Sequence, residues 1–109
     1  MIKIKNMKYA VAANKKDENS EISAMAARAP YFLIFNEKGE LLEKISNPFA
    51  VGGGGAGFSV AKILADKNIN CFVAENIGKN MAEALKERGV EYCERAGLAK
   101  QAIEEIVKK

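Results

Sequence analysis

Apolar residues in the first half of the chain form short runs separated by polar segments, and this pattern predicts three strands. Residues 9–13 (YAVAA) and 31–35 (YFLIF) are continuous apolar runs, which are typical of strands buried on both faces of a sheet. We expect the run at 31–35 to be the central strand. Residues 41–45 (LLEKI) are more polar and follow a turn ending at Gly39, so they predict a strand at the edge of the sheet.

A helical spacing of apolar residues appears between the first two strands and again in the second half of the chain. Ile22, Met25 and Ala26 predict one or two helical turns before Pro30. From Gly57 onward, helices and strands alternate. Helices are expected to begin near Gly57, Lys79 and Leu98, and strands are expected at 71–74 and 90–93.

This order of elements indicates the fold class. Three strands followed by alternating helices and strands predict a five-stranded mixed sheet with helices on both faces, which is a three-layer α/β/α domain. A chain of 109 residues has the usual size of one domain. We assign residues 9–109 to this domain and residues 1–8 to a basic N-terminal segment.

The composition is that of a globular protein, with 49% hydrophobic and 28% charged residues. No stretch approaches the roughly 20 apolar residues of a membrane span, and residues 1–8 lack the apolar run of a signal peptide. We therefore expect a cytoplasmic location and no membrane partner. The net charge of +3 is weak and no aromatic residues interleave with a basic run, so no specific nucleic-acid partner is predicted.

Histidine is absent, which excludes His-based catalytic triads and ordinary His/Cys metal sites within one chain. The two cysteines, Cys71 and Cys93, are too few for a disulfide framework or a zinc-ligand pattern, and we interpret both as small buried side chains. Cys93 could instead reach the carboxyl edge of the sheet, where a thiolate beside Arg95 could bind iron. Cys71 begins its strand and should lie at the opposite edge.

The segment 52–57 (GGGGAG) has five glycines in six positions and is the strongest candidate for ligand contact. Without Cβ atoms, its backbone can approach a ligand closely and adopt left-handed angles. The segment leads into a predicted helix, whose unpaired N–H groups and dipole favour an anion. A flexible corner that touches no ligand is the alternative interpretation.

Two nucleotide-binding motifs match this segment poorly. Gly52, Gly54 and Gly57 satisfy G-x-G-x-x-G, and Glu75 lies 18 residues beyond Gly57. That fingerprint should open the sheet and follow a strand directly, whereas three predicted strands come before it here. The P-loop pattern fails because Phe58 stands at the position of the phosphate-binding lysine.

Two further strand-to-helix junctions, 76–80 (NIGKN) and 94–97 (ERAG), resemble the first. If the strands are parallel, all three junctions meet at the carboxyl edge of the sheet, the usual ligand crevice of open α/β folds. Lys79 and Arg95 add positive charge to the helix N-termini, so the ligand should be anionic. The candidate cofactor-binding residues are Arg28, Gly52, Gly53, Gly54, Gly55, Gly57, Asn76, Gly78, Lys79 and Asn80, although Arg28 could equally pair with Asp17 or Glu21.

Seven short pieces of the sequence stand in an order that carries a resemblance. They are Ser23, 28–33 (RAPYFL), 47–49 (NPF), 55–57 (GAG), 64–67 (LADK), 76–80 (NIGKN) and Gly97. From Tyr9 onward the chain thereby resembles the dinitrogenase iron–molybdenum cofactor biosynthesis family. The resemblance implies a ribonuclease H-like α/β/α fold and the binding or carriage of iron–molybdenum cofactor or of iron–sulfur precursors.

One piece departs from the pattern of that family. Where the resemblance implies Ser-x-His-Phe-Gly-Arg-Ala, residues 23–29 read SAMAARA. Met25 therefore replaces a histidine that could ligate metal. Methionine is a soft, weak ligand, and we interpret Met25 as a core residue, which leaves Met25 and Cys93 as weak candidates for metal ligation.

The leading hypothesis is a non-catalytic binding or carrier domain for an anionic iron-containing cofactor or cluster, with cofactor-biosynthesis proteins as partners. One alternative is a small enzyme or sensor that holds a nucleotide or phosphorylated metabolite in the same crevice. Another is a protein-interaction module. Nuclease activity is not expected, because residues 9–13 carry no carboxylate that could hold a metal ion.

Overall fold

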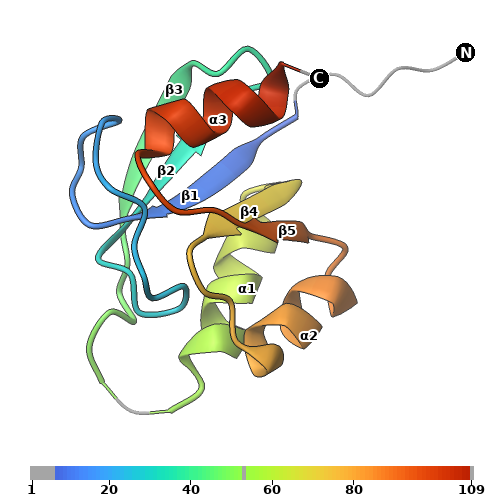
Figure 1. The fold of residues 1–109 in the computed structure, drawn as a ribbon. Helices are drawn as coiled ribbons and strands as arrows, with labels where there is room; N and C mark the ends of the chain where they lie inside the picture. Colours follow the sequence, from blue (N-terminus) through green and yellow to red (C-terminus); the bar gives the residue numbers. More distant parts are fainter. Residues whose placement is uncertain (1–6, 53, 109) are drawn as a thin grey trace, which may run out of the picture.

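The computed structural model describes residues 7–52 and 54–108. Gly53, a predicted binding residue, and the basic residues Lys3 and Lys5 lie outside these ranges. Within the described ranges, the predicted strands and the three predicted long helices are confirmed (Figure 1). Their order is β1 (Tyr9–Ala13), β2 (Tyr31–Phe35), β3 (Leu41–Ser46), α1 (Ala56–Asp66), β4 (Cys71–Ala74), α2 (Lys79–Glu87), β5 (Glu91–Glu94) and α3 (Ala99–Val107).

The five strands form one mixed sheet in the order β3-β2-β1-β4-β5. β1 is antiparallel to β2 and parallel to β4, and β5 is parallel to β4. The prediction of β3 as an edge strand is confirmed, and β2 is an interior strand. The centre of the sheet is β1 and not β2, because the two parallel strands of the second half of the chain add on the far side of β1.

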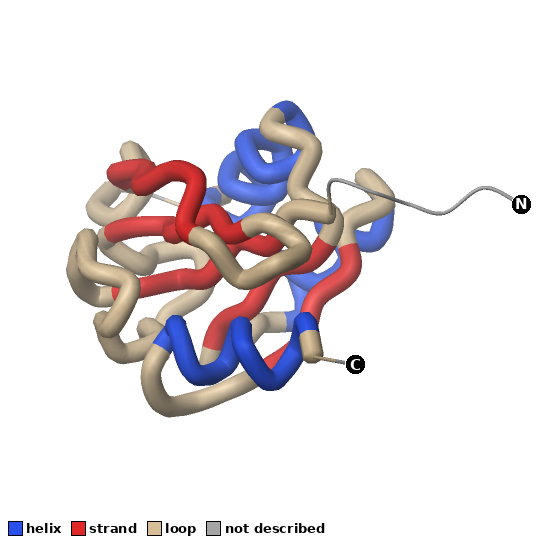
Figure 2. The backbone as a smooth tube through the Cα atoms, turned by 90° about the horizontal axis from the view of Figure 1, so that it is seen from above, coloured by secondary structure: helices blue, strands red, loops and turns tan. Residues whose placement is uncertain are grey.

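Helices cover both faces of the sheet, so the three-layer prediction is confirmed. α1 and α2 lie on one side and α3 on the other (Figure 2). Successive side chains of β1 and β2 alternate between these two layers. Ala10, Ala12, Phe32 and Ile34 pack with α1 and α2, whereas Val11, Ala13, Leu33 and Phe35 pack with α3.

The residues after β1 do not form the predicted helical turns. Ile22 forms an isolated antiparallel bridge with Ala13, and its backbone N–H donates to the carbonyl of Gly97 at 2.8 Å. The N–H of Ser23 donates to the carbonyl of Ala12, also at 2.8 Å. Long-range partners therefore take the backbone groups that a helix would pair locally. Met25 is 55% exposed, so its interpretation as a core residue is wrong.

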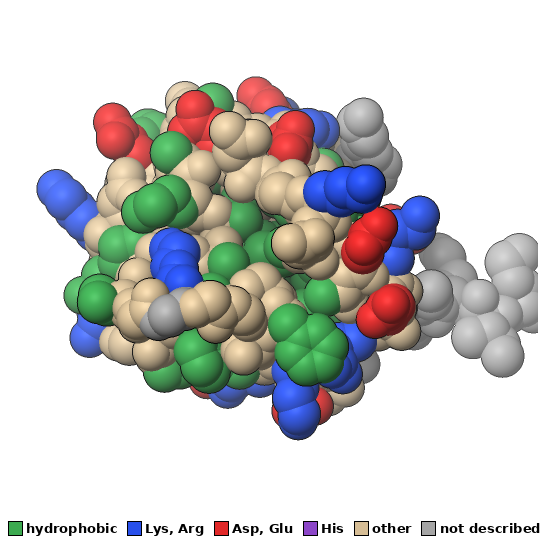
Figure 3. All heavy atoms as spheres, turned by 90° about the horizontal axis from the view of Figure 1, so that it is seen from below, with side chains coloured by type: hydrophobic (Ala, Val, Ile, Leu, Met, Phe, Trp, Pro, Cys, Tyr) green, Lys and Arg blue, Asp and Glu red, His purple; other side chains and the backbone are tan. Residues whose placement is uncertain are grey.

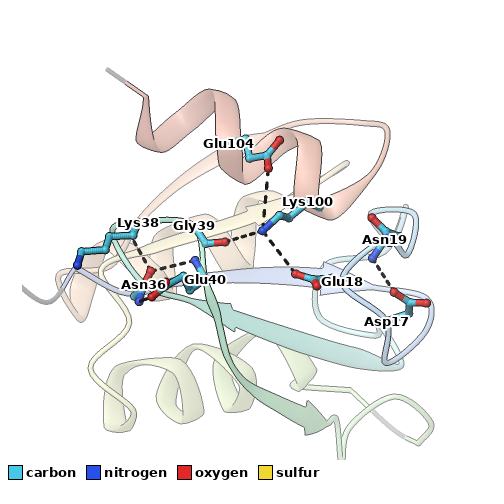
Figure 4. A network of polar contacts seen from close by, with 9 residues as sticks. All are labelled: Asp17, Glu18, Asn19, Asn36, Lys38, Gly39, Glu40, Lys100 and Glu104. Carbon is cyan, nitrogen blue, oxygen red and sulfur yellow. Dashed lines mark hydrogen bonds and ion pairs between the residues drawn. The ribbon is translucent and has the colours of Figure 1, made fainter.

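Lys100 connects α3 to the rest of the domain (Figure 4). Its Nζ donates to the carbonyl of Gly39 at 3.0 Å, in the turn between β2 and β3. The same Nζ lies 3.6 Å from the carboxylate of Glu18 and 4.0 Å from that of Glu104. One side chain thus joins the last helix to two loops from the first half of the chain. None of the helices in the described residues is long and apolar enough to cross a bilayer.

Candidate functional site

A hollow of about 330 Å³ lies at the end of the molecule where α1 and α2 begin. Three segments meet there: the residues after Ile22, the start of α1 and the junction between β4 and α2 (Figure 1). The residues that line the hollow are Ala26, Ala27, Gly57, Asn76, Gly78, Lys79, Asn80 and Met81. The predicted meeting of Gly57 with residues 76–80 is therefore present in the structure.

Two helices begin at this hollow without a capping side chain from the described residues. The N-cap of α1 is Gly55, with φ of 83°, and the N-cap of α2 is Gly78 in an extended conformation. The N–H groups of a first helical turn have no partner within the helix, and the helix dipole adds partial positive charge at the same place. The start of α2 lies in the wall of the hollow and can therefore donate hydrogen bonds to an anion.

Lys79 gives the hollow a formal positive charge. It is the first residue of α2, is exposed, and is the one basic residue in the lining set. A second hollow of about 360 Å³ shares Gly57 and Asn80 with the first and carries the carboxylates of Glu83 and Glu87. The side-chain charge along α2 therefore changes from positive at Lys79 to negative at Glu83 and Glu87. Figure 3 shows this end of the molecule as a depression with hydrophobic and backbone atoms at its floor and charged side chains around it.

Gly57 has a packing role that the glycine pattern did not predict. A Cβ atom on Gly57 would lie 3.1 Å from Cβ and 3.3 Å from Cα of Met81, so α1 and α2 approach each other closely at this position. A Cβ on Gly52, Gly54 or Gly55 would meet nothing within 4 Å. Gly52 and Gly55 have φ of 131° and 83°, which side chains rarely adopt, so these two glycines serve the path of the loop.

Asn47 and Arg28 join residues 27–29 to residues 47–49, the segment that leads into the glycine loop. The side-chain amide of Asn47, which is 7% exposed, donates to the carbonyls of Ala27 and Ala29 at 2.8 Å each. Its Oδ1 accepts from the N–H of Phe49 at 2.9 Å, and Arg28 Nη1 donates to the carbonyl of Phe49 at 3.0 Å. This role of Asn47 was not predicted, although an asparagine before Pro-Phe after a strand is a turn signal that could have suggested it.

The prediction that three helix N-termini meet at one site is wrong for α3. That helix lies on the other face of the sheet, and the chain itself occupies its first N–H groups. The N–H of Ala99 donates to the carbonyl of Ser20 at 2.9 Å, and the N–H of Lys100 donates to the carbonyl of Glu18 at 3.0 Å. Arg95 is exposed and donates to the carbonyl of Glu94. The start of α3 therefore adds nothing to the hollow.

The weak metal candidates lie outside the set of residues that lines the hollow. Cys93 packs beside Cys71 against the α3 layer, and both thiols are free and half-buried. Met25 precedes the lining residue Ala26 and is exposed. Within the described ranges, no group of three His, Cys, Asp or Glu side chains could hold a metal ion.

Comparison with known proteins identifies the family. The sequence model of the family described as dinitrogenase iron-molybdenum cofactor matches residues 7–109. The chain belongs to this family. The resemblance noted in the sequence is thereby confirmed, and the protein is a small domain of the dinitrogenase iron-molybdenum cofactor family, whose description names a metal cofactor.

Relatives and solved structures agree with this assignment. An uncharacterized protein of Methanocaldococcus jannaschii is 29% identical over 94 residues, which are 84% of this chain and 76% of that protein. The NMR structure of a putative NifB protein from Thermotoga is 30% identical, with a TM-score of 0.79 over 94% of this chain and 88% of the other.

A third comparison concerns the fold alone. The apo form of the orange protein from Desulfovibrio gigas superposes with a TM-score of 0.87 at 21% identity, over 96% of this chain and 91% of the other. The α/β arrangement of the dinitrogenase iron-molybdenum cofactor family is thus shared by these structures. Its description as ribonuclease H-like stays a prediction from the resemblance.

Proposed function

We propose that this domain binds and carries an anionic metal cofactor of the iron–molybdenum or iron–sulfur class in the hollow at the start of α1 and α2, without transforming it. The observation that carries the proposal is the joint presence, in one wall, of the uncapped start of α2 and the ammonium group of Lys79. Both favour negative charge, and the description of the family names a metal cofactor, which supports such a ligand.

The lining of the hollow fits a cofactor held by hydrogen bonds and shape. Asn76 and Asn80 supply amide donors, whereas Ala26, Ala27 and Met81 supply apolar surface. The eight lining residues include no thiol, imidazole or carboxylate. Cluster sulfides and carboxylates can accept hydrogen bonds from such a site, but the iron would keep its own ligands. A cargo held in this way can be released intact, which suits a carrier.

The remaining predicted residues have supporting roles in this proposal. Gly55 is the N-cap of α1, Gly57 allows α1 to approach α2 closely, and Gly52 and Gly54 belong to the loop that leads there. Arg28 holds Phe49 next to the segment that contains the lining residues Ala26 and Ala27. Cofactor-biosynthesis proteins, which would deliver or receive the cargo, are the partners that follow from this role.

The test is an anaerobic titration of the purified protein with isolated iron–molybdenum cofactor and, separately, with a synthetic [4Fe–4S] cluster, followed by absorbance. Lys79→Ala should weaken binding by about three- to tenfold, because it removes a charge worth about 0.7–1.4 kcal/mol beside a helix N-terminus. It should also reduce the loss of affinity with salt. Lys86→Ala is the matched control, since Lys86 lies in the last turn of the same helix.

Three outcomes would contradict the proposal. The first is equal affinity of the Lys79 and Lys86 variants, and the second is a loss of cluster binding in Cys71→Ala. The third concerns the nucleotide alternative, for which the same titration is run with NAD and ATP. A dinucleotide site would need Glu75 for the ribose, so micromolar NAD binding that disappears in Glu75→Ala would favour that alternative over a carrier.

A further inference from the structure

The two cysteines lie diagonally across neighbouring parallel strands. In the ladder between β4 and β5, Cys71 stands opposite Glu91, and Cys93 stands opposite Val73. The cysteines are thus two positions apart along the sheet and project from the same face, where both pack against the α3 layer. Diagonal neighbours have Cα atoms about 7–8 Å apart. The side chains of Cys71 and Cys93 lean toward each other closely enough for a hydrogen bond between the thiols.

The surroundings of the pair are apolar on one side and open on the other. Tyr9, Ile106 and Val107 pack in the same cluster as the two cysteines. Both cysteines are half-buried, so the pair lies at the border of this cluster and not in its fully buried part. The pair lies on the opposite face of the sheet from α1 and α2, and so from the walls of the proposed cofactor hollow.

The thiols also influence each other. The pKa of Cys71 is raised to about 12, chiefly by burial and then by the charge of the neighbouring Cys93 and a hydrogen bond with its side chain. Arg95 acts weakly in the opposite direction on the Cys71 pKa. The two thiolates would repel each other, and a cation placed between the sulfurs would relieve this repulsion once both groups are deprotonated.

We propose that Cys71 and Cys93 form a two-coordinate site for a soft monovalent metal ion, Cu(I) foremost. Thiolate ligands favour Cu(I), zinc and iron–sulfur clusters. No third His, Cys, Asp or Glu joins them into a metal-binding group in the described part of the chain, which disfavours tetrahedral zinc and cluster iron. The site is independent of the proposed cofactor hollow.

Two neighbouring thiols could instead form a disulfide, but the register of β4 and β5 disfavours one. Disulfides require Cα atoms about 4.4–6.8 Å apart, less than the roughly 7–8 Å of diagonal neighbours. An ion inserted between the sulfurs bridges the additional distance. On binding, two S–H groups release their protons to solvent as two S–Cu bonds form, and copper stays Cu(I), so no oxidant or reductant takes part.

The test is an anaerobic titration with Cu(I) in competition with a coloured Cu(I) chelator. We expect one ion per chain, an ultraviolet thiolate-to-copper band, and an affinity that increases with pH because protons are displaced. Cys71→Ser and Cys93→Ser should each lower the affinity by about tenfold or more, since even loss of a partner behind a ligand costs about 10–100-fold. Serine has nearly the size of cysteine, and circular dichroism with thermal unfolding checks that each variant is folded.

Four results would overturn the proposal. They are unchanged affinity in either serine variant, two ions bound independently to one chain, a copper-bridged dimer in gel filtration, and a mass loss of two hydrogens in air before copper is added. The last result would establish a disulfide instead. The outcome of the cluster titration at the hollow is separate, because the serine variants leave Lys79 and the start of α2 unchanged.

Discussion

Glu94, the last residue of β5, accepts a hydrogen bond from the backbone N–H of Ile77 at 2.9 Å through its Oε2 atom. Ile77 is buried and directly precedes Gly78, the N-cap of α2. The carboxylate therefore holds the chain at the point where it enters the wall of the hollow. An edge strand thus positions the start of a helix that lies against the sheet.

Glu94→Ala should make this junction more mobile and lower the free energy of unfolding by about 1–2 kcal/mol, the value of a part-buried hydrogen bond to a charged group. Glu94→Gln keeps an oxygen acceptor and should therefore lose less stability than Glu94→Ala. Urea unfolding measures the stability, and amide exchange measures the protection of the Ile77 N–H. Equal protection of that N–H in the wild type and the alanine variant would show that the bond is absent in solution.

Gly57→Ala should destabilise the domain by about 1–2 kcal/mol, because its new methyl group meets the Cβ and backbone of Met81 and forces the two helices apart. This cost exceeds the roughly 1 kcal/mol that alanine gains over glycine inside a helix. Gly54→Ala is the matched control, since its Cβ would meet nothing within 4 Å. Thermal unfolding compares the two variants, and a lower Tm for the Gly54 variant than for the Gly57 variant would contradict the packing role.

Asn47→Ala should cost about 2–3 kcal/mol, because it leaves the carbonyls of Ala27 and Ala29 and the N–H of Phe49 without their partner. Asn47→Asp should lower the stability at least as much, since a carboxylate oxygen would then face the carbonyls of Ala27 and Ala29. Asn19→Ala, at an exposed position, should change stability by less than about 0.5 kcal/mol. Chemical denaturation measures all three variants, and a small effect of Asn47→Ala would mean that water replaces the amide.

The pKa of Cys71 predicts a loss of stability in alkali. Its folded-state pKa is raised from the ordinary 9.0 to about 12, chiefly by burial, so between these values the unfolded chain releases a proton that the folded chain keeps. The contribution of this group is fully present below pH 9 and is lost as the pH increases toward 12. Stability measured against pH should therefore fall less steeply in Cys71→Ser than in the wild type. Parallel curves for the two proteins would show that the thiol is not perturbed.

Sequence patterns predicted the strands well where the apolar runs are continuous. Residues 9–13 and 31–35 are short continuous apolar runs, which suit buried strands. The alternation of helices and strands that follows Gly57 is typical of parallel strands, and with their carboxyl ends together Gly57 and residues 76–80 were expected to meet. The segment from Ile22 to Ala26 was misread because its apolar spacing is helical, whereas its backbone partners, Ala12, Ala13 and Gly97, come from other parts of the chain.

The supporting contacts of the candidate site could not be predicted from local patterns. The bond between Ile77 and Glu94 joins positions 17 residues apart, and the approach of Gly57 to Met81 depends on how two helices pack. The proximity of Cys71 to Cys93 depends on the register of β4 and β5. Each of these contacts follows from the packing of elements against one another, which spacing along one segment does not contain.

The capping of α3 by the carbonyls of Glu18 and Ser20 determines which changes the loop before Glu21 can accept. Every residue type has a carbonyl group, so substitution of Glu18 leaves the cap intact as long as the chain keeps its course. An insertion or deletion would instead shift the carbonyls out of line with the N–H groups of Ala99 and Lys100. Those N–H groups would then be open to water or to an anion. The length of this loop, more than its composition, therefore keeps the first N–H groups of α3 paired.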